Sequence, residues 1–339
     1  MELMYMAGSI VTAGFADVDI IKTIETFPQR HGLVNVTGIS RALGGAACNC
    51  GLDLAMLDPN LTVRPMAVTG DDENGAYIYQ QFSKCPNIDL SLMIRGGDTG
   101  FTDVIDEADT RVRTFLVYRG ANRLFGVDSV DVDKLDCDIF HIGYICLLDA
   151  LDAPDSQYGT KMARLLAKVR AAGIPTSVDA VTDATGRHRI LMPAAMKQAD
   201  ILCVNEHEAG AAFGVDLTLP DGSINEERVP EILRRFKENG VKKWAVIHCP
   251  QCAWGMDEND DIIRVPGAIL PQGWIKGTVG AGDAFVSGLL IGFREGKNLP
   301  DAMEYGIAAA ITSLSEPGAS DGIKPIPQAM ELLKTMKRN

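Results

Sequence analysis

The feature that most constrains the fold is a regular alternation of short apolar runs with longer helical patterns. In the second half of the chain this pattern predicts strands at 138–142, 176–178, 201–204 and 243–248. Helices are predicted between or after them at 157–172, 193–199, 205–213 and 226–239. Apolar strands separated by helices are typical of a parallel sheet that is covered on both faces. The alternation therefore predicts an α/β fold with a doubly wound, mostly parallel sheet.

The ends of the chain follow the same alternation, with one interruption. Strands are predicted at 4–12, 33–41 and 61–68, and helices at 46–57, 76–82, 284–293, 299–314 and 326–336. Between 88 and 117, however, three short β-rich runs (90–94, 101–105 and 112–117) are separated only by turns. We therefore expect a single domain over 1–339, into which the segments 20–42 and 88–118 insert a small β-sheet lid.

Composition excludes several classes of protein. The 339 residues carry a formal net charge of −13, which argues against a nucleic-acid partner because phosphate contacts need a basic surface. No span approaches the roughly 20 apolar residues of a membrane helix. The uncharged stretch 3–16 lacks a basic n-region, so we expect a buried first strand there and not a signal peptide. Eight cysteines in a chain of this length predict reduced thiols and a cytoplasmic location.

The stretch from Gly277 to Phe285 (GTVGAGDAF) carries the clearest chemical signal. Its glycines allow backbone N–H groups to approach an anion closely, and a following helix N-terminus adds partial positive charge. Asp283 would repel a phosphate, so we expect it to face a neutral reactant and to deprotonate its hydroxyl. An aspartate with an ordinary pKa is already ionised at neutral pH, and no tuning is expected. The stretch therefore predicts phosphoryl transfer to a hydroxyl.

Other polar positions follow predicted strands, where ligands bind in open α/β sheets. Asp19 or Asp17 could hydrogen-bond a substrate hydroxyl, or could simply be solvated in a turn. The pair Gly44 and Gly45 would let a ligand approach the backbone, and Asn49 would either contact that ligand or cap the helix.

Asn205 and Glu208 follow the predicted strand 201–204 and lie three residues apart at a helix start. Such a pair can hold a hydrated Mg²⁺, which needs few protein oxygens. The same spacing is also that of a capping box, in which the two side chains bond to each other's backbone N–H groups. Spacing alone favours the capping box.

Three further motifs do not predict a site. Cys249 and Cys252 have the spacing of a redox or half-zinc motif, but without a second pair we expect structural thiols. The glycines around Ala281 do not complete a dinucleotide fingerprint, and there is no Gly-Lys-Ser/Thr of a P-loop.

Taken together, the motifs resemble those of the ribokinase-like, or PfkB-type, carbohydrate kinases, nearly from end to end. In chain order these motifs are Asp19, Gly44–Gly45 with Asn49, the turn 70–75, the turn 120–122, Asn205 to Glu208, and Gly277 to Phe285.

The resemblance implies an ATP-dependent sugar kinase that transfers the γ-phosphoryl group to a primary hydroxyl. By position, Asp283 is similar to the family's general base, and the backbone N–H groups at 281–283, with Gly280 and Gly282 in the loop, to its anion hole. The implied sugar contacts are Asp19, Gly44, Gly45 and Asn49. Asn205 and Glu208 are the implied Mg²⁺ ligands, and together with Thr278, Gly280 and Gly282 they are also the implied contacts to ATP. The resemblance therefore favours a metal site at Asn205 and Glu208 over the plain capping box that their spacing alone favours.

Two departures bear on ligands. Gly277 stands where members commonly have an aspartate, which weakens the case for a monovalent-cation (K⁺) site, although backbone carbonyls remain. His248-Cys249-Pro250 replaces a Thr-x-Gly turn, which affects the expected contacts to adenine and ribose. A nucleoside kinase, a catalytically silent sugar-binding regulator and a redox role for the two cysteines are the alternatives. An exposed lid edge would also allow a homodimer.

Overall fold

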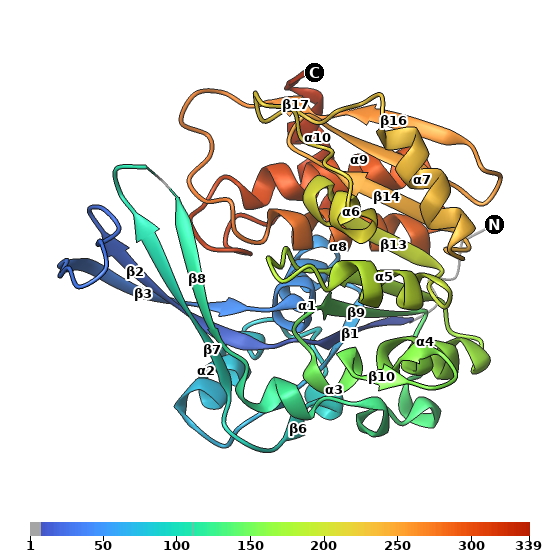
Figure 1. Ribbon diagram of the computed structural model, residues 1–339, viewed down its shortest axis with the longest axis horizontal. Helices are drawn as coiled ribbons and strands as arrows, with labels where there is room; N and C mark the ends of the chain where they lie inside the picture. Colours follow the sequence, from blue (N-terminus) through green and yellow to red (C-terminus); the bar gives the residue numbers. More distant parts are fainter. Residues whose placement is uncertain (1–7, 111) are drawn as a thin grey trace.

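The computed structural model describes residues 8–110 and 112–339, which form a three-layer body and a smaller projecting sheet (Figure 1). The main sheet has eight strands in the order β16-β15-β14-β13-β12-β9-β1-β4. The six strands from β14 to β4 are parallel, while β15 and β16 continue the sheet as an antiparallel edge. The doubly wound, mostly parallel sheet expected from the sequence is thereby confirmed. In sheet order the strands span Ile262–Pro266, Cys252–Met256, Trp244–His248, Ile201–Asn205, Thr176–Ala180, Ile139–Ile145, Ser9–Gly14 and Thr62–Met66.

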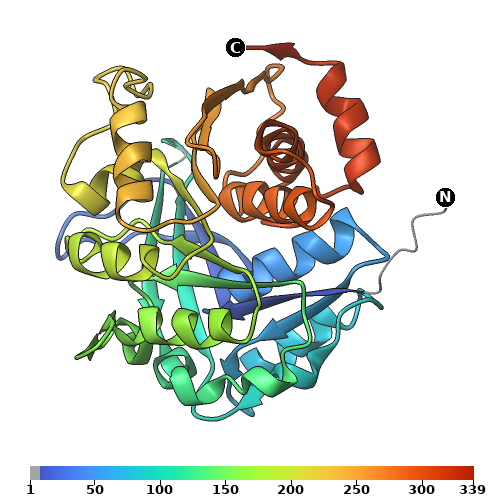
Figure 2. The same ribbon diagram turned by 90° about the vertical axis from the view of Figure 1, so that its right-hand side faces the viewer.

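Helices cover both faces of the main sheet (Figure 2). One face is covered by α4 (Lys161–Ala171), α5 (His188–Met196), α6 (Glu206–Phe213) and α7 (Val229–Glu238). The other face is covered by α1 (Ala46–Leu57), α8 (Ala281–Arg294), α9 (Leu299–Ser313) and α10 (Ile326–Lys334). The other two α-helices of the described residues are α2 (Glu73–Phe82) and α3 (Asp149–Asp152).

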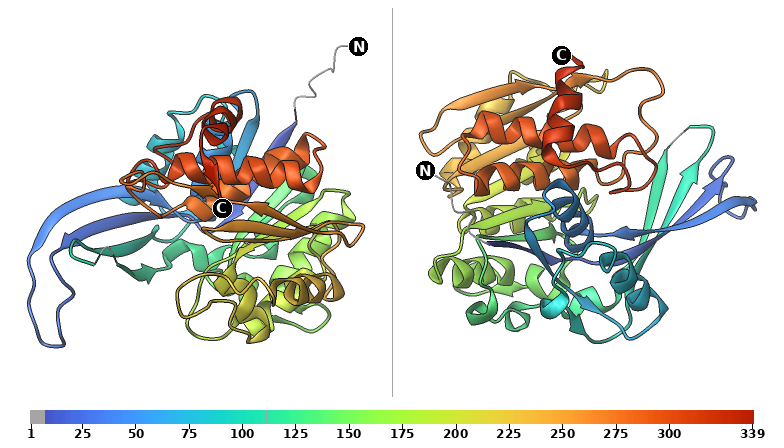
Figure 3. Two further views of the ribbon diagram at one scale, coloured as in Figure 1. Left: turned by 90° about the horizontal axis from the view of Figure 1, so that it is seen from above. Right: turned by 180° about the vertical axis from the view of Figure 1, so that it is seen from behind.

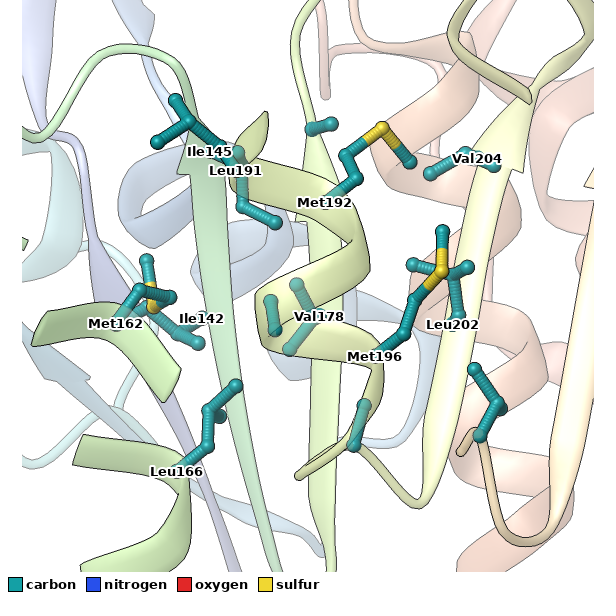
Figure 4. Packing of buried hydrophobic residues seen from close by; sticks show 14 of the residues in the cluster. Ile142, Ile145, Met162, Leu166, Val178, Leu191, Met192, Met196, Leu202 and Val204 are labelled. Atoms are coloured by element: carbon teal, nitrogen blue, oxygen red, sulfur yellow. The ribbon is translucent and has the colours of Figure 1, made fainter. Parts of the chain in front are cut away.

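The two cores follow from the period of a strand, which points successive side chains to opposite faces. Leu202 on β13 belongs to the core under α4–α7, whereas its neighbours Ile201 and Cys203 belong to the core under α1 and α8–α10. Figure 4 shows the first core, where Met192 and Met196 of α5 lie over the strands. Strands buried on both faces have no polar side, and this is why they appear in the sequence as continuous apolar runs.

The second sheet has four strands in the order β3-β2-β7-β8. They span Val36–Gly44, Asp17–Ile24, Gly100–Glu107 and Arg113–Tyr118. The central pair β2 and β7 is parallel, and both outer pairs are antiparallel. The sheet projects beyond the carboxyl ends of the main strands, and the turn between β2 and β3 reaches furthest from the body (Figure 3).

Several expected element boundaries are wrong. The segment 88–99 does not join the second sheet: it forms a short 3₁₀ helix at Leu90–Leu92 and then β6 (Ile94–Arg95), which pairs with β5 (Val68–Thr69). The helix expected at 193–199 is α5, which begins at His188 and tolerates Pro193 in its interior. Of the strand expected at 4–12, residues 4–7 lie outside the described part of the chain.

Two further short strand pairs lie in the described residues: β10 (Pro154–Asp155) with β11 (Gly159–Thr160), and β17 (Ala268–Ile269) with β18 (Lys337–Arg338). β11 takes residues that were expected to begin helix 157–172, so α4 starts only at Lys161. Within 8–110 and 112–339, no helix has the length and apolar character needed to cross a membrane.

Candidate active site

A cleft of about 870 Å³ lies where the carboxyl ends of the parallel strands meet the second sheet. The carboxyl ends of five main strands contribute to its wall, through Phe15, Tyr144, Asp179, Asn205 and His248. The second sheet contributes side chains from β2, β7 and β8. Of the residues expected at a site, those lining the cleft are Asp19, Gly45, Asn49, Asn205, Glu208, Thr278, Gly280, Gly282 and Asp283. Gly44 and Ala281 are not among its lining residues.

The N-terminus of α8 opens into this cleft. Gly280 is the N-cap residue with φ 79°, a left-handed conformation that an L side chain rarely adopts. A Cβ at this position would lie 2.5 Å from the Cβ of Ala319, so space as well as conformation requires glycine. The helix begins at Ala281, three residues earlier than expected from the sequence, and no side chain caps it. The first N–H groups of a helix have no partner within the helix and can bind an anion.

Asp283 lies in the first turn of α8 and is buried. Its carboxylate accepts hydrogen bonds from Tyr144 Oη, at 2.7 and 2.8 Å from the two oxygens, and from Asn49 Nδ2 at 2.9 Å. Cys50 Sγ lies 3.7 Å from the same carboxylate. The side chain is therefore held in one orientation by three groups from α1 and β9.

Burial raises the pKa of Asp283 above its ordinary value, while the hydrogen bonds from Tyr144 and Asn49 lower it. Burial dominates, so the expectation of an unperturbed carboxylate is wrong. The reason is the dry environment between α1 and α8, which disfavours the charged form. A raised pKa also makes the carboxylate a better proton acceptor once it is ionised.

Asp17 and Asp19 lie on β2 and not in a turn, so the solvated-turn alternative is wrong. Because they are two residues apart on one strand, their side chains share a face, and both are buried in the cleft wall. Thr102 Oγ1 on β7 donates to Asp17 at 2.5 Å. Gly44 on the neighbouring strand makes room for the pair: a Cβ there would lie 2.4 Å from Asp17 Oδ1 and 2.7 Å from Asp19 Oδ1.

The crowded acids have perturbed pKa values. Burial raises the pKa of Asp17 to about 6. Burial, together with repulsion from Asp17, raises the pKa of Asp19 to about 8, although Arg113 opposes the shift. A carboxyl group that keeps its proton can donate as well as accept a hydrogen bond.

Asn49 lies one turn into α1, whose N-cap Gly45 has φ 86°. The amide does not cap the helix, because its Nδ2 donates to Asp283 and its Oδ1 is buried without a partner. The sequence left open whether Asn49 contacts a ligand or caps the helix, and the structure excludes the capping role. Its Oδ1 is thus a buried acceptor that no group in the described residues uses.

Asn205 and Glu208 form the capping box that their spacing favours. Asn205 Oδ1 accepts from the Glu208 N–H at 2.9 Å, and Glu208 Oε2 accepts from the Asn205 N–H at 3.0 Å. Thr182 Oγ1 also donates to Glu208 Oε1 at 3.0 Å. Burial raises the pKa of Glu208 to about 7. The capping box is therefore present, and Glu208, which belongs to it, also lines the cleft.

Asp179 is a site residue that the sequence reasoning missed. It lies at the end of β12, is buried, and lines the cleft near Glu208. Burial, followed by repulsion from Glu208 and Asp283, raises its pKa well above the usual range. The signal was available, since Asp179 directly follows the strand predicted at 176–178. Tyr144 was missed in the same way, just after the strand predicted at 138–142.

The last residue of β14, His248, lies against α8, where its ring stacks on Phe285 with centroids 5.0 Å apart. A Cβ at Gly282 would lie 3.3 Å from this ring, so glycine allows the imidazole to approach the helix start. At Gly277 a Cβ would lie 2.5 Å from the carbonyl oxygen of Pro317. An aspartate does not fit there without movement of that loop, and a K⁺ site remains a prediction.

Comparisons with known proteins identify the family. The family model for pfkB family carbohydrate kinases matches residues 8–326. A 5-dehydro-2-deoxygluconokinase of Geobacillus kaustophilus is 35% identical over 316 residues, which cover 87% of this chain and 85% of that relative.

Solved structures share the fold. The ribokinase of Arabidopsis thaliana complexed with ribose and ATP has a TM-score of 0.76 at 19% identity, covering 97% of this chain and 99% of that one. A nucleoside kinase of Methanocaldococcus jannaschii, an archaeal member of the ribokinase family, has a TM-score of 0.74 at 17% identity, with 97% and 99% covered. The chain therefore belongs to the pfkB family of carbohydrate kinases, and is a phosphotransferase whose acceptor is an alcohol group.

Proposed function

We propose that this protein transfers the γ-phosphoryl group of ATP to a primary hydroxyl of a small carbohydrate, with Asp283 as the general base. The observation that carries this proposal is the position of Asp283. Its buried carboxylate lies in the first turn of α8, beside N–H groups that have no partner within the helix. A base and an anion-binding helix end within one turn suit a reaction that removes a proton and stabilises transferred negative charge.

The chain's own groups supply three functions. Asp283 accepts the proton of the acceptor hydroxyl, while Tyr144 and Asn49 hold its carboxylate in place. The N–H groups at 281–283, in the loop of Gly280 and Gly282, bind the phosphoryl oxygens. Positioning and charge stabilisation account for most of the catalysis in phosphoryl transfer, and a placed base adds roughly 10²–10⁴-fold.

The acceptor would bind between β2 and α1, where Asp17, Asp19 and Asn49 line the cleft. Hydrogen-bonding groups of this density match the hydroxyls of a sugar. Phe115 and Val117 on β8 add apolar surface to the same cleft and favour the second candidate, a nucleoside acceptor. In the nucleoside candidate the base would stack on Phe115, whereas a small sugar has no base to place there.

The ATP end would lie toward His248, Thr278 and the start of α6. A Mg²⁺ ion fits the residues there, because Asp179 and Glu208 are buried acids that repel each other and a cation would offset both charges. Asn205 is placed to hydrogen-bond water around such an ion. When bound, Mg²⁺ supplies neutralisation of phosphate charge.

The test is release of ADP in the presence of sugars, sugar acids and nucleosides. Asp283→Asn preserves the size of the side chain and should lower kcat by about two orders of magnitude or more, with ATP affinity largely retained. Glu258→Gln makes the same carboxylate-to-amide change on the exposed turn between β15 and β16 and serves as the control. Near-normal kcat in Asp283→Asn would remove Asp283 from the role. Binding of a sugar without turnover across the whole panel would favour a silent regulator.

We also propose a homodimer through the second sheet. Its outer strands β3 and β8 expose apolar side chains, with Ile39, Phe115 and Leu116 each more than half exposed. Unpaired strand edges readily pair with a second copy. Light scattering coupled to size exclusion should give twice the chain mass, and Ile39→Lys should shift it toward the monomer. A wild-type monomer at micromolar concentration would contradict this proposal.

A further inference from the structure

Three side chains outside the proposed reaction machinery gather beside the cleft. Cys146 follows β9, Asp183 lies in the loop after β12, and His188 begins α5. One ligand atom from each, a thiol sulfur, a carboxylate oxygen and an imidazole nitrogen, all lie within 4.8 Å of one another. Sequence spacing gives no sign of this cluster, because the residues come from separate elements and are brought together only by the fold.

His188 is arranged as metal-binding histidines usually are. Its side chain is buried, and Nε2 lies 2.8 Å from the carbonyl oxygen of Val181. Since a carbonyl only accepts, Nε2 carries the proton and donates it. Nδ1 is then an acceptor, and it is buried without any partner. A hydrogen bond that fixes the tautomer and leaves the second nitrogen free is the common support of a metal ligand.

Cys146 has a backbone conformation that is unusual for a non-glycine residue. Its φ is 84°, in the region that favours glycine, and the side chain is fully buried. Its N–H donates to Asp152 Oδ1 at 3.3 Å, and its carbonyl accepts from Arg187 Nη2 at 2.5 Å. Backbone strain of this kind persists only where the surroundings enforce it, and it often marks a functional position.

The charges around the cluster suit a divalent cation. Arg187 lies 3.6 Å from Asp183 and 3.4 Å from Asp152, so one guanidinium faces two carboxylates. A dication bound by one thiolate and one carboxylate would bring this region close to neutrality, with Arg187 still paired to Asp152.

We propose that Cys146 Sγ, His188 Nδ1 and Asp183 bind one Zn²⁺ ion. Sulfur, nitrogen and oxygen donors in this combination suit zinc and not the hard ions Mg²⁺ or Ca²⁺. Binding releases one proton, because the Cys146 S–H bond breaks as the Zn–S bond forms. Ligands about 2.0–2.3 Å from zinc lie about 3.5 Å apart, a spacing within the 4.8 Å limit inside which the three ligand atoms already lie. Three protein ligands leave one position of the tetrahedron open.

The site would fix the loop that forms one wall of the cleft. Residues 181–184 all line the cleft, and Thr182 in this loop donates to Glu208. Zinc would join this loop through Asp183 to β9 and α5. Its binding is therefore expected to order the wall next to the proposed phosphate end, without contributing to the proton transfer.

The test uses the metal-free full chain and Co²⁺ alone as a spectroscopic probe, followed by displacement with Zn²⁺. We expect one equivalent of Co²⁺ with a thiolate-to-cobalt charge-transfer band and tetrahedral visible bands. Cys146→Ser should abolish the charge-transfer band. His188→Gln and Asp183→Asn should each weaken binding at least about tenfold. Stoichiometric Zn²⁺ should raise Tm of the wild type and not of Cys146→Ser.

The other thiol pair provides the control. Cys249 and Cys252 have sulfur atoms 3.6 Å apart and could bind cobalt themselves, so the double variant Cys249→Ser/Cys252→Ser must keep the full signal. Loss of the signal in this double variant, its survival in Cys146→Ser, or no thiolate band in the wild type would each overturn the proposal. If Cys146→Ser does not fold, Asp183→Asn at the cleft edge decides the question by the same titration.

Discussion

Tyr144→Phe removes one hydroxyl group and with it a single, well-defined interaction of the proposed base. Tyr144 Oη donates to both carboxylate oxygens of Asp283, at 2.7 and 2.8 Å. Burial, and repulsion from Asp283, hold the pKa of Tyr144 well above its usual value, so the hydroxyl keeps its proton and remains a donor. A donor of this kind stabilises the ionised form of the carboxyl group.

The size of the effect follows from the kind of bond. A hydrogen bond to a charged group contributes about 1.5–3 kcal/mol, and one pKa unit corresponds to about 1.36 kcal/mol. Loss of the hydroxyl should therefore raise the pKa of Asp283 by about one to two units above its already raised value. Because the base must be ionised, the acidic limb of the kcat/KM profile should move to higher pH by the same amount.

The assay is ADP release between about pH 5 and pH 9 with the best acceptor found for the wild type. Activity of Tyr144→Phe should fall at low pH and return to within a few-fold of the wild type at high pH. Tyr305→Phe is the matched control, because the Tyr305 hydroxyl also donates to a carboxylate, Glu295, but far from the cleft. An unshifted acidic limb in Tyr144→Phe, or an equal shift in the control, would refute the reasoning.

Three further predictions concern the cleft wall. Gly280→Ala places a Cβ 2.5 Å from Ala319 at a left-handed φ, so the start of α8 must move, and kcat should fall about 10–100-fold in the same assay. Gly44→Ala crowds Asp17 and Asp19. The free energy of unfolding measured in urea should fall by about 1–3 kcal/mol, and KM for the acceptor should rise. For Asp19 the folded pKa of about 8 lies above the unfolded value near 4, so ionisation destabilises the fold as pH rises between them. The wild type should lose up to about 1.4 kcal/mol of stability per pH unit there, and Asp19→Asn should lose less.

Each of these has a clear contrary outcome. Gly296→Ala is the matched control for Gly280→Ala, because Gly296 also has a positive φ but its Cβ would meet nothing within 4 Å. Equal losses of kcat in the two variants would show that backbone strain alone, and not the closeness of Ala319, is responsible. An unchanged KM in Gly44→Ala, or parallel pH–stability curves for wild type and Asp19→Asn, would contradict the assigned packing and charges.

The sequence determined those parts of the molecule that depend on local pattern. Strands buried on both faces have no polar side, so the parallel sheet was visible as apolar runs between helices. The glycine stretch before α8 was equally visible, because a close backbone approach to an anion excludes side chains. The boundaries were less certain: α8 begins at Ala281 because a helix can start on small residues that carry no apolar signal of their own.

Tertiary structure alone decided which polar groups meet. Asn49 and Asp283 are 234 positions apart and share a hydrogen bond, and Tyr144 reaches the same carboxylate from β9. The raised pKa of Asp283 likewise depends on its burial between two helices, which no local pattern encodes. The cluster of Cys146, Asp183 and His188 exists only because the adjacent strands β9 and β12 end side by side and α5 begins next to them. Periodicity in the sequence fixes how each segment lies against the core, whereas distances between chemical groups depend on how the segments pack.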